Sequence, residues 1–469
     1  MIGVPRPVLK PFVGIRREEF GVILYRGGSD QIQAIHPVAA YVLTLMDGRR
    51  TLREIAEALA GELGRGVEDA MEIVEVVLDR YADYVDLEGS HVKDLPSPEE
   101  LLEGVPAEIP PEEALYGRLS APTGFGYIVT HACPNRCRYC YAAAWRRTRL
   151  EDDLVPLDVM LRTVDEAADV GVKTILMTGG EPFMRPDLVD IVERGLKRDI
   201  FVYIPTKSLI TEEKARRLSE AGLGWIQVSI DSPNPDTEDF LVGPGAHRRL
   251  TTTVRNLVRH GIDVRVNSVV TSYNVREVPR LIEWLYELGV SKISLSPYQS
   301  PHDRTDDDLF PSVGDYAWLL DRIEELPRHL REMLDPAGIR AIENAVRVNR
   351  DELEDVEALR RCSAGRSSLV ILPDGRVSFC ERVALDERFV VGDLRKQSLM
   401  EVWRSERLER LVYPPRELFS GTACHDCPLF DECTRLGKRC YVRAMDAYGE
   451  PFAPDPICPA APRVEGRFV

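Results

Sequence analysis

Between residues 122 and 310, short β-rich runs alternate with amphipathic helical patterns, and no other feature constrains the fold as strongly. Apolar residues recur at helical spacing between the runs, as in Leu157–Val170 and Glu212–Ala221. Runs that alternate in this way pair as a parallel sheet with helices packed outside it. The β-rich runs are Tyr127–Thr130, Thr174–Met177, Phe201–Ile204, Ile226–Ile230, Val264–Val270 and Lys292–Leu295. We therefore predict an α/β fold whose six β-α units curl into a partial barrel.

The stretches on either side of this unit differ from it in composition. Residues 96–121 are rich in Pro and Glu, which is typical of a linker. Residues 311–355 have a charged helical pattern and predict a helical bridge. Residues 356–469 contain seven of the ten cysteines and few long periodic segments, so they form a separate C-terminal domain.

Residues 1–95 predict a small domain of strands followed by three helices. Thr51 and Glu54 have the spacing of a capping box, which marks the start of the second helix. A strand pair followed by three short helices is winged-helix-like. The expected elements are strands near Gly21–Arg26 and Gln31–Ile35, and helices near Pro37–Met46, Thr51–Leu63 and Val67–Tyr81.

Charge and hydropathy exclude several classes of protein. The formal net charge of −17 disfavours nucleic acid as a partner, because phosphate binding needs a basic surface. The first twenty residues lack the apolar core of a signal peptide, and no run of 18 apolar residues predicts a membrane span. We expect a cytoplasmic protein, in which cysteines serve as thiolate ligands more often than as disulfides.

Three cysteines follow the first predicted barrel strand as Cys133-x3-Cys137-x2-Cys140. Three thiolates in a tight loop hold a [4Fe–4S] cube and leave one iron open to chelate a small molecule. A zinc site and a simple ferredoxin centre are the alternatives. Both need a fourth Cys or His nearby, for which His131 is the only candidate.

This loop, with an aromatic Tyr139 before its last cysteine, resembles the signature of the radical S-adenosylmethionine (SAM) superfamily. The other markers of that superfamily also fall at strand ends, where a barrel places its active site. The resemblance implies that one group of residues contacts SAM: Gly179, Gly180, Glu181, Pro182, Thr206, Ser229, Asp231 and Asn267. Two departures are Lys207-Ser208, where Asn-Gly is usual, and Leu241-Val242-Gly243, where Arg-Gly is common.

The C-terminal cysteines resemble the SPASM extension, a domain that holds two auxiliary iron–sulfur clusters in radical SAM enzymes. The resemblance implies an outer cluster on Cys424, Cys427, Cys433 and Cys458, and an inner cluster on Cys362, Cys380 and Cys440. A zinc ribbon is the alternative, although it accounts for only four of the seven cysteines. Some relatives place a catalytic carboxylate directly after the cysteine matched here by Cys380. Glu381 is therefore a candidate general base, and an exposed loop glutamate is the other interpretation.

Residues 1–90 resemble the PqqD-like domain that binds leader peptides beside peptide-modifying enzymes. The matching segments include Phe20–Arg26 and Ala34–Ala40. A short sheet with an exposed edge can accept a peptide as an added strand, and we expect Val22 to lie on that edge. DNA binding and a purely structural cap are the alternatives. The helix Thr51–Leu63 offers only Arg53 among three glutamates, which disfavours DNA.

Together these resemblances imply an enzyme that reductively cleaves SAM and modifies a ribosomally made peptide by hydrogen abstraction. Its expected cofactors are SAM, a [4Fe–4S] cluster at the SAM site and two auxiliary clusters. Its expected partners are a precursor peptide and a reduced ferredoxin or flavodoxin. Two other functions stay open: the same chemistry on a protein residue or a tetrapyrrole, and a non-catalytic electron carrier with a regulatory winged helix.

Overall fold

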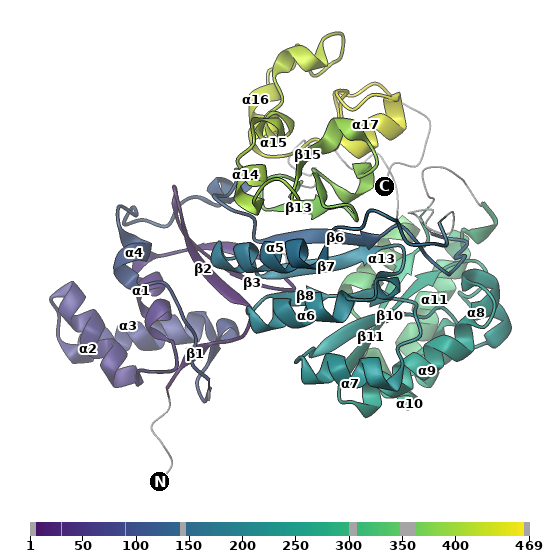
Figure 1. Cartoon of the computed structure of the whole chain (residues 1–469), viewed down its shortest axis with the longest axis horizontal. Helices are drawn as coiled ribbons and strands as arrows, with labels where there is room; N and C mark the ends of the chain where they lie inside the picture. The colour runs from purple at the N-terminus through teal and green to yellow at the C-terminus, as the bar shows by residue number, and fades with distance from the viewer. Residues whose placement is uncertain are drawn as a thin grey trace.

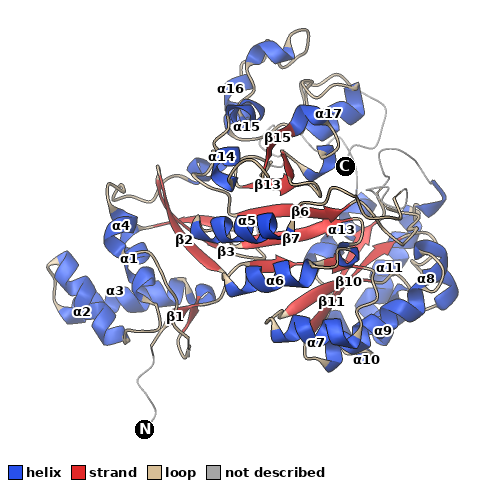
Figure 2. Ribbon diagram, in the orientation of Figure 1, coloured by secondary structure: helices blue, strands red, loops and turns tan. Residues whose placement is uncertain are grey.

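The computed structural model describes residues 6–29, 31–89, 91–140, 147–299, 307–347 and 362–463. A central curved sheet divides the molecule (Figure 1), with the N-terminal domain against one end of it and the C-terminal domain above it. Helices cover the outer face of the sheet (Figure 2). The predicted α/β fold with a partial barrel and two flanking domains is confirmed.

The barrel strands run parallel in chain order, and the third predicted run is interrupted. Ile204 separates β8 from β9, so β8 pairs with β7 while β9 pairs with β10. The break divides the barrel wall into two hydrogen-bonded sheets. The strands are β6 (Gly124–Thr130), β7 (Thr174–Gly179), β8 (Phe201–Tyr203), β9 (Pro205–Thr206), β10 (Trp225–Ser229), β11 (Asp263–Val270) and β12 (Lys292–Pro297).

Helices that connect the strands pack mainly against the outer face of the sheet (Figure 2). Burial alternates residue by residue along β11, because one face meets the helices and the other faces the interior of the barrel. Each helix turns its apolar stripe toward the sheet, as Val254 and Leu257 of α9 do. The helices are α5 (Leu157–Asp169), α6 (Leu188–Lys197), α7 (Glu212–Glu220), α8 (Pro235–Val242), α9 (Ala246–Arg259) and α10 (Val278–Glu287).

Aromatic side chains gather at the N-terminal ends of the strands. Trp225 packs against Phe201 and Tyr203 with ring centroids 5.5 and 5.3 Å away, and the Arg265 guanidinium lies 4.1 Å from the Trp225 ring centroid. Phe12 of the N-terminal domain packs against Phe201 at 5.6 Å. This end of the barrel is therefore filled, which leaves the C-terminal ends of the strands for a site.

The N-terminal domain contains a three-stranded sheet, in the order β2-β3-β4, and a two-stranded one, β1-β5. Strand β3 is central, so the expectation that Val22 lies on an edge is wrong. The missed strand β2 pairs along the whole of β3 and makes β4 the edge next to the C-terminal domain. The elements are β1 (Val8–Leu9), β2 (Val13–Glu18), β3 (Gly21–Arg26), β4 (Ile32–Ile35), β5 (Val85–Asp86), α1 (Pro37–Leu45), α2 (Leu52–Leu63) and α3 (Val67–Arg80).

The N-terminal domain docks on the filled end of the barrel. The Arg16 guanidinium donates to the carbonyls of Ala121 and Val170 at 2.7 and 3.0 Å. The Phe12 N–H donates to Asp199 at 2.7 Å, and Lys93 pairs with the same carboxylate at 2.9 Å. The expected linker, residues 96–121, is not wholly irregular, because it contains α4 (Pro98–Leu102) and a 3₁₀ turn at Glu112–Tyr116.

The C-terminal domain continues the barrel sheet. Strand β13 (Ser368–Ile371) pairs parallel to β6, and β14 (Arg376–Ser378) and β15 (Val390–Asp393) extend the sheet antiparallel beyond it. The buried Trp403 indole donates to the Leu119 carbonyl at 3.1 Å and ties this domain to the linker. Its helices are α14 (Leu399–Trp403), α15 (Glu406–Val412), α16 (Phe430–Arg435) and α17 (Tyr441–Tyr448).

The described part of the expected bridge, residues 311–347, is mainly helical. It comprises α11 (Val313–Glu325), α12 (Arg328–Arg331) and α13 (Pro336–Arg347), and residues 348–355 lie outside the described residues. The Ile293 N–H donates to the Met333 carbonyl at 2.8 Å, so this segment covers the last barrel strand.

Candidate active site and iron–sulfur centres

The cysteine loop begins where β6 ends and is held against the end of β7. The Thr130 carbonyl accepts the Gly180 N–H at 2.7 Å, and the Ala132 carbonyl accepts the Glu181 N–H at 2.8 Å. The Glu151 carboxylate accepts the Thr130 hydroxyl at 2.5 Å and the His131 N–H at 2.7 Å. These bonds bring the cysteine loop and the Gly-Gly-Glu-Pro turn together at one end of the barrel.

Glycine is required at two positions of this junction. A Cβ atom on Gly180 would lie 2.0 Å from the Ala132 carbonyl oxygen, and one on Gly179 would lie 2.4 Å from the Thr130 oxygen. Gly179 also has φ +122°, which side chains rarely adopt. The two glycines thus have a packing role beside any contact with SAM.

The three thiols of the loop lie near one another. Burial, with a smaller contribution from the neighbouring Cys140 thiol, raises the pKa of Cys133 to about 11 and of Cys137 to about 12. Among the described residues, no three His, Cys, Asp or Glu side chains converge as a single metal ion requires. A cube takes one thiolate on each of three irons and needs no such convergence, so the donor set fits a [4Fe–4S] cluster better than zinc.

Glu181 joins the second and third strand ends. Its buried carboxylate accepts the Thr206 hydroxyl at 2.6 Å and the Lys207 N–H at 2.9 Å. Burial raises the pKa of Glu181, and these hydrogen bonds act in the opposite direction. The Lys207 ammonium lies 5.3 Å from the Tyr139 ring centroid, which places a cation beside the cysteine loop.

The Asp231 carboxylate joins three segments of the site. It accepts the Tyr139 hydroxyl from the cysteine loop and the Val269 N–H at 2.7 Å from β11. Glu238 accepts the N–H groups of Asp231 and Ser232 at 2.8 Å each and so fixes the turn that carries Asp231. Asp231 thus orients the cysteine loop from within a fully buried position.

A row of polar side chains crosses the barrel interior. Ser229, Asn267 and Ser294 lie on adjacent strands in register, and the Ser296 hydroxyl donates to the Asn267 amide oxygen at 2.9 Å. Two of these residues, Ser294 and Ser296, were not predicted. They stand at every second position of β12, and this alternation was the available signal.

The remaining cysteines lie in two groups within the C-terminal domain. In the first group, burial raises the pKa of Cys380 to about 11, with the neighbouring Cys362 and Cys440 acting in the same direction, and burial and Cys440 raise the pKa of Cys362. The buried Asp455 carboxylate accepts the Cys440 N–H at 3.2 Å and the Arg443 Nε–H at 3.0 Å. Asp455 therefore positions Cys440, which follows the other two only after a long interval in the sequence.

The second group contains Cys424, Cys427, Cys433 and Cys458. Burial raises the pKa of Cys424 to about 11, while the nearby Arg439 guanidinium lowers it. Arg416 donates to the Cys427 carbonyl at 2.9 Å and fixes the turn between the close cysteines. The described thiols of this domain thus form one group of three and one of four, and their assignment as cluster ligands stays a prediction.

Glu381 is partly exposed on the turn after Cys380. Its carboxylate raises the pKa of the Cys380 thiol, so it lies beside the three-cysteine group. None of the described hydrogen bonds of Glu181, Thr206 or Asp231 involves it. The described contacts of the candidate base therefore place it beside the auxiliary cysteines.

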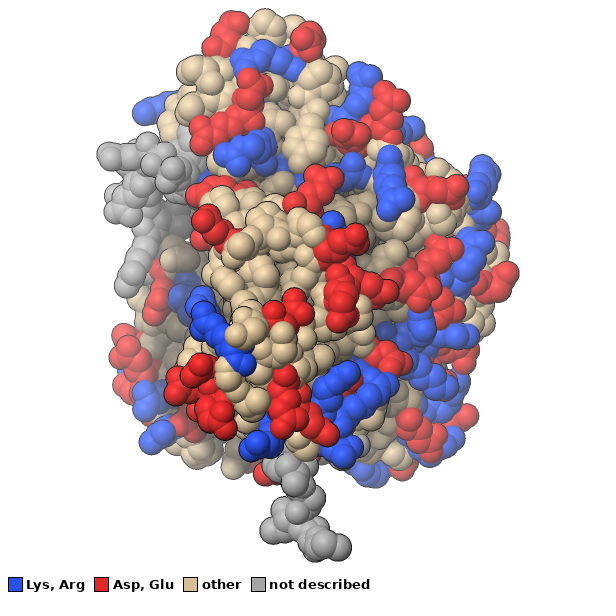
Figure 3. Space-filling model, turned by 90° about the vertical axis from the view of Figure 1, so that its left-hand side faces the viewer, with Lys and Arg blue, Asp and Glu red and all other residues tan. Residues whose placement is uncertain are grey.

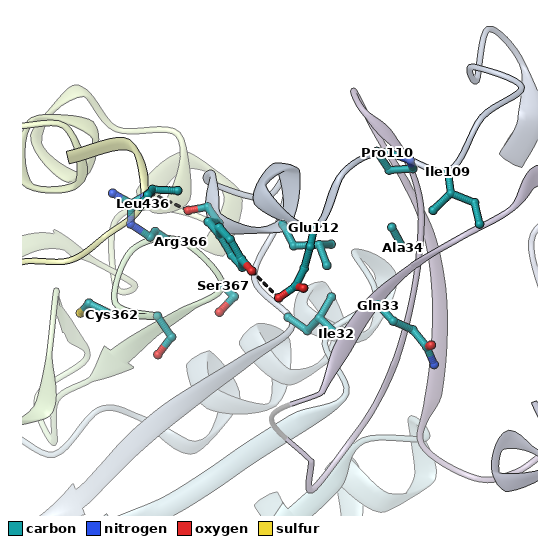
Figure 4. Close-up of a pocket in the computed structure, with 13 residues that line it drawn as sticks. Ile32, Gln33, Ala34, Ile109, Pro110, Glu112, Cys362, Arg366, Ser367 and Leu436 are labelled. Atoms are coloured by element: carbon teal, nitrogen blue, oxygen red, sulfur yellow. Dashed lines mark hydrogen bonds between the residues drawn. The ribbon is translucent and has the colours of Figure 1, made fainter. Parts of the chain in front are cut away.

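A cavity of about 600 Å³ separates the N-terminal domain from the C-terminal domain. Ile32, Gln33 and Ala34 of the edge strand β4 form one wall, and Cys362 and Ser367 lie on the opposite side (Figure 4). Arg366 donates to the carbonyls of Tyr116 and Arg435 at 2.8 and 2.9 Å, which holds the far wall to the linker. Further apolar residues of the lining are Ile109, Pro110, Leu115 and Leu436.

Comparison with protein families agrees with this division. The radical SAM superfamily matches residues 127–295, the SPASM iron–sulfur cluster-binding domain matches residues 362–428, and the family of coenzyme PQQ synthesis protein D (PqqD) matches residues 21–84. The chain is an enzyme of the radical SAM superfamily with SPASM and PqqD-like domains. These domains imply SAM and [4Fe–4S] clusters as its cofactors.

Similar proteins act on different substrates. An AdoMet-dependent heme synthase of Methanosarcina barkeri is 26% identical over 355 residues, covering 72% of this chain and 97% of the relative. A PqqA peptide cyclase of Methylocella silvestris is 25% identical over 358 residues, covering 73% and 88%. SuiB of Streptococcus suis, solved with its precursor peptide SuiA, shares the fold with a TM-score of 0.66 and 18% identity over 97% of this chain and 100% of that chain. No helix in the described parts of the chain is long and apolar enough to cross a membrane.

Proposed function

We propose that this enzyme modifies a ribosomally made peptide, whose leader binds at the N-terminal domain and whose core segment enters the barrel. The cavity beside β4 carries this proposal, because it joins an unpaired strand edge to the C-terminal domain. Among the described residues, no backbone hydrogen bond links β4 to any segment besides β3. An extended peptide can therefore add to this edge as a strand.

The position of the cavity suits a peptide better than a small planar substrate. The N-terminal domain docks on the filled end of the barrel, so a bound leader starts far from the mouth. A chain that leaves β4 through the cavity passes Cys362 on the way (Figure 4). On the face that carries α2 and α3, acidic and basic side chains are interspersed (Figure 3), which disfavours DNA as the ligand of the winged helix.

The residues at the mouth would hold the cofactors in a fixed arrangement. Cys133, Cys137 and Cys140 would ligate the cluster, and Gly179, Gly180, Glu181, Pro182, Thr206, Ser229, Asp231 and Asn267 would line the SAM pocket. When bound and reduced, the cluster supplies the electron that cleaves SAM. The aromatic side chains of Phe201, Tyr203 and Trp225 close the opposite end of the barrel to solvent, which protects a reactive site from water.

The three-cysteine group leaves one ligand position unfilled by protein sulfur, because all ten cysteines are assigned. We propose Cys362, Cys380 and Cys440 as the inner auxiliary ligands, and the four-cysteine group as the outer ones. Glu381 directly follows Cys380, and its carboxylate is one candidate to complete the inner set. A cysteine of the substrate peptide is the alternative ligand, since Cys362 lines the cavity.

The test uses the reconstituted full-length enzyme with SAM and its precursor peptide, under reducing and anaerobic conditions. Mass spectrometry should show a modified peptide, and Ala34→Tyr should weaken peptide binding about tenfold by narrowing the cavity. Dithionite-driven SAM cleavage without peptide should not change in this variant. The matched control is Arg53→Tyr on the exposed face of α2, which should bind peptide normally. Normal peptide binding by Ala34→Tyr would show that the peptide does not bind in this cavity.

A tetrapyrrole is the second candidate substrate, favoured by the heme synthase relatives that match most of their length. Incubation with an iron porphyrin such as Fe-coproporphyrin III, named in another relative, distinguishes the two. We expect no porphyrin product. Porphyrin turnover without modification of any peptide would show that the substrate is a tetrapyrrole and not a peptide.

A further inference from the structure

The cysteine loop turns alternate residues outward. Cys133, Cys137 and Tyr139 are buried, whereas Arg136 and Arg138 between them are exposed. The N–H groups of both arginines donate to carbonyls at the end of α8, at 2.9 Å to Val242 and 2.9 Å to Leu241. Two cationic side chains therefore lie on the outer surface directly over the buried cysteines.

Aromatic side chains adjoin these arginines. The Arg138 guanidinium lies 3.9 Å from the centroid of the Phe240 ring, which packs against Tyr273 at 4.7 Å. Phe240 and Tyr273 are 39% and 46% exposed, although both are large and apolar. We call Arg136, Arg138, Phe240, Tyr273 and the exposed Arg248 of α9 the loop patch. Exposed aromatics beside arginine are typical of a protein interface.

The charge of the loop patch contrasts with that of the whole chain. The formal net charge is −17, yet Arg136 and Arg248 have no carboxylate within 4.0 Å among the described residues. The neighbouring Asp239 is turned inward, where it accepts the N–H groups of Gly245 and His247 at 2.6 and 3.0 Å. A negatively charged partner would be repelled by the chain as a whole and attracted at this surface.

We propose that the loop patch is the docking surface for an acidic one-electron carrier, of the flavodoxin or ferredoxin class. SAM cleavage consumes one electron, which must reach the cluster ligated by the cysteines directly beneath the loop patch. The reduced carrier gives up one electron and is oxidised, the cluster is reduced by one electron, and no bond forms in this step. This docking proposal requires only that the enzyme cleaves SAM, and it holds whether the substrate is a peptide or a tetrapyrrole.

The experiment compares two electron sources in the reconstituted enzyme: reduced flavodoxin and dithionite, which does not need to dock. Arg136→Glu with Arg138→Glu should lower flavodoxin-driven formation of 5′-deoxyadenosine at least about tenfold. The dithionite-driven rate should stay within about twofold. Flavodoxin binding, measured by calorimetry, should weaken by a similar factor, and wild-type binding should weaken as salt is raised.

The matched control reverses the charge of two exposed arginines of α12 by the substitutions Arg328→Glu and Arg331→Glu. These residues lie near the opposite end of the barrel. The control variant should respond to both electron sources as the wild type does. If the loop-patch variant binds flavodoxin normally, or loses both rates equally, the docking assignment is overturned. Arg136→Gln with Arg138→Gln repeats the test without introduced negative charge. If peptide binding falls instead of flavodoxin binding, the loop patch belongs to the substrate.

Discussion

The cysteine loop at the barrel mouth and the cysteines of the C-terminal domain show two ways of building an iron–sulfur site. In the loop, all three thiols come from residues 133–140, directly after one strand. In the C-terminal domain, the thiols come from residues 362–458 and are grouped only by the fold. The thiols of the loop are therefore brought together by a short stretch of sequence, whereas those of the C-terminal groups are brought together only by tertiary packing.

This difference explains which supports matter at each site. Hydrogen bonds from the Gly-Gly-Glu turn fix the loop from the next strand. The C-terminal groups rely on charged side chains of their own domain: the buried Asp455 lies beside Cys440, and the partly exposed Arg416 lies beside Cys427. A variant in one region should thus leave the other intact, because no ligand is shared between them.

The largest expected effect is the loss of SAM cleavage in Cys137→Ala. Removing one of three loop thiolates should abolish dithionite-driven 5′-deoxyadenosine formation, because the cluster that supplies the electron is not held. The auxiliary clusters should remain visible by EPR. The partner variant Cys380→Ala should lose auxiliary signal and keep SAM cleavage in the absence of substrate. If Cys137→Ala still produces 5′-deoxyadenosine, the loop is not the SAM site.

A second variant tests the local supports of the loop. Gly180→Ala places a Cβ atom 2.0 Å from the Ala132 carbonyl oxygen, so the two strand ends must separate. We expect the free energy of unfolding to fall by about 2–3 kcal/mol, with weaker SAM binding. Gly61→Ala in α2 meets no atom within 4 Å and should raise stability by about 0.5–1 kcal/mol. Equal changes in the free energy of unfolding for the two variants would show that the close packing of Gly180 against Ala132 does not matter for stability.

A third variant tests the long-range supports. Asp455→Asn removes the charge that pairs with Arg443 and weakens the bond to the Cys440 N–H. We expect about four fewer irons per chain after reconstitution, with the SAM-site signal unchanged. Asp426→Asn, on an exposed carboxylate that pairs only with His425 among the described ion pairs, is the control. Full iron content in Asp455→Asn would show that Cys440 needs no such support.

The smallest effect is expected for Tyr139→Phe. This change removes the hydroxyl that donates to Asp231 and keeps the ring beside Lys207. The free energy of unfolding should fall by about 1–2 kcal/mol, because the buried carboxylate loses a donor. Denaturant unfolding measures it, and SAM cleavage should continue. A complete loss of cleavage would give the hydroxyl a direct role in the reaction.

The parts of the fold that sequence predicts are those controlled by local pattern. The six barrel runs, the capping box at Thr51 and the cysteine loop all depend on neighbouring residues, and each forms. The break at Ile204 and the central position of Val22 were missed, because strand pairing is set by distant partners. Glu238 was missed for the same reason, since only the folded turn shows that it holds the Asp231 N–H.

Peptide modification by SAM-derived chemistry is tested most directly by following a hydrogen atom from the substrate. A precursor peptide deuterated in its core segment is incubated with the reduced, reconstituted enzyme and unlabelled SAM. We predict deuterium in 5′-deoxyadenosine, in an amount that matches the modified peptide and that falls with Ala34→Tyr. Unlabelled 5′-deoxyadenosine formed at the same rate with and without peptide, beside an unmodified peptide, would contradict the account.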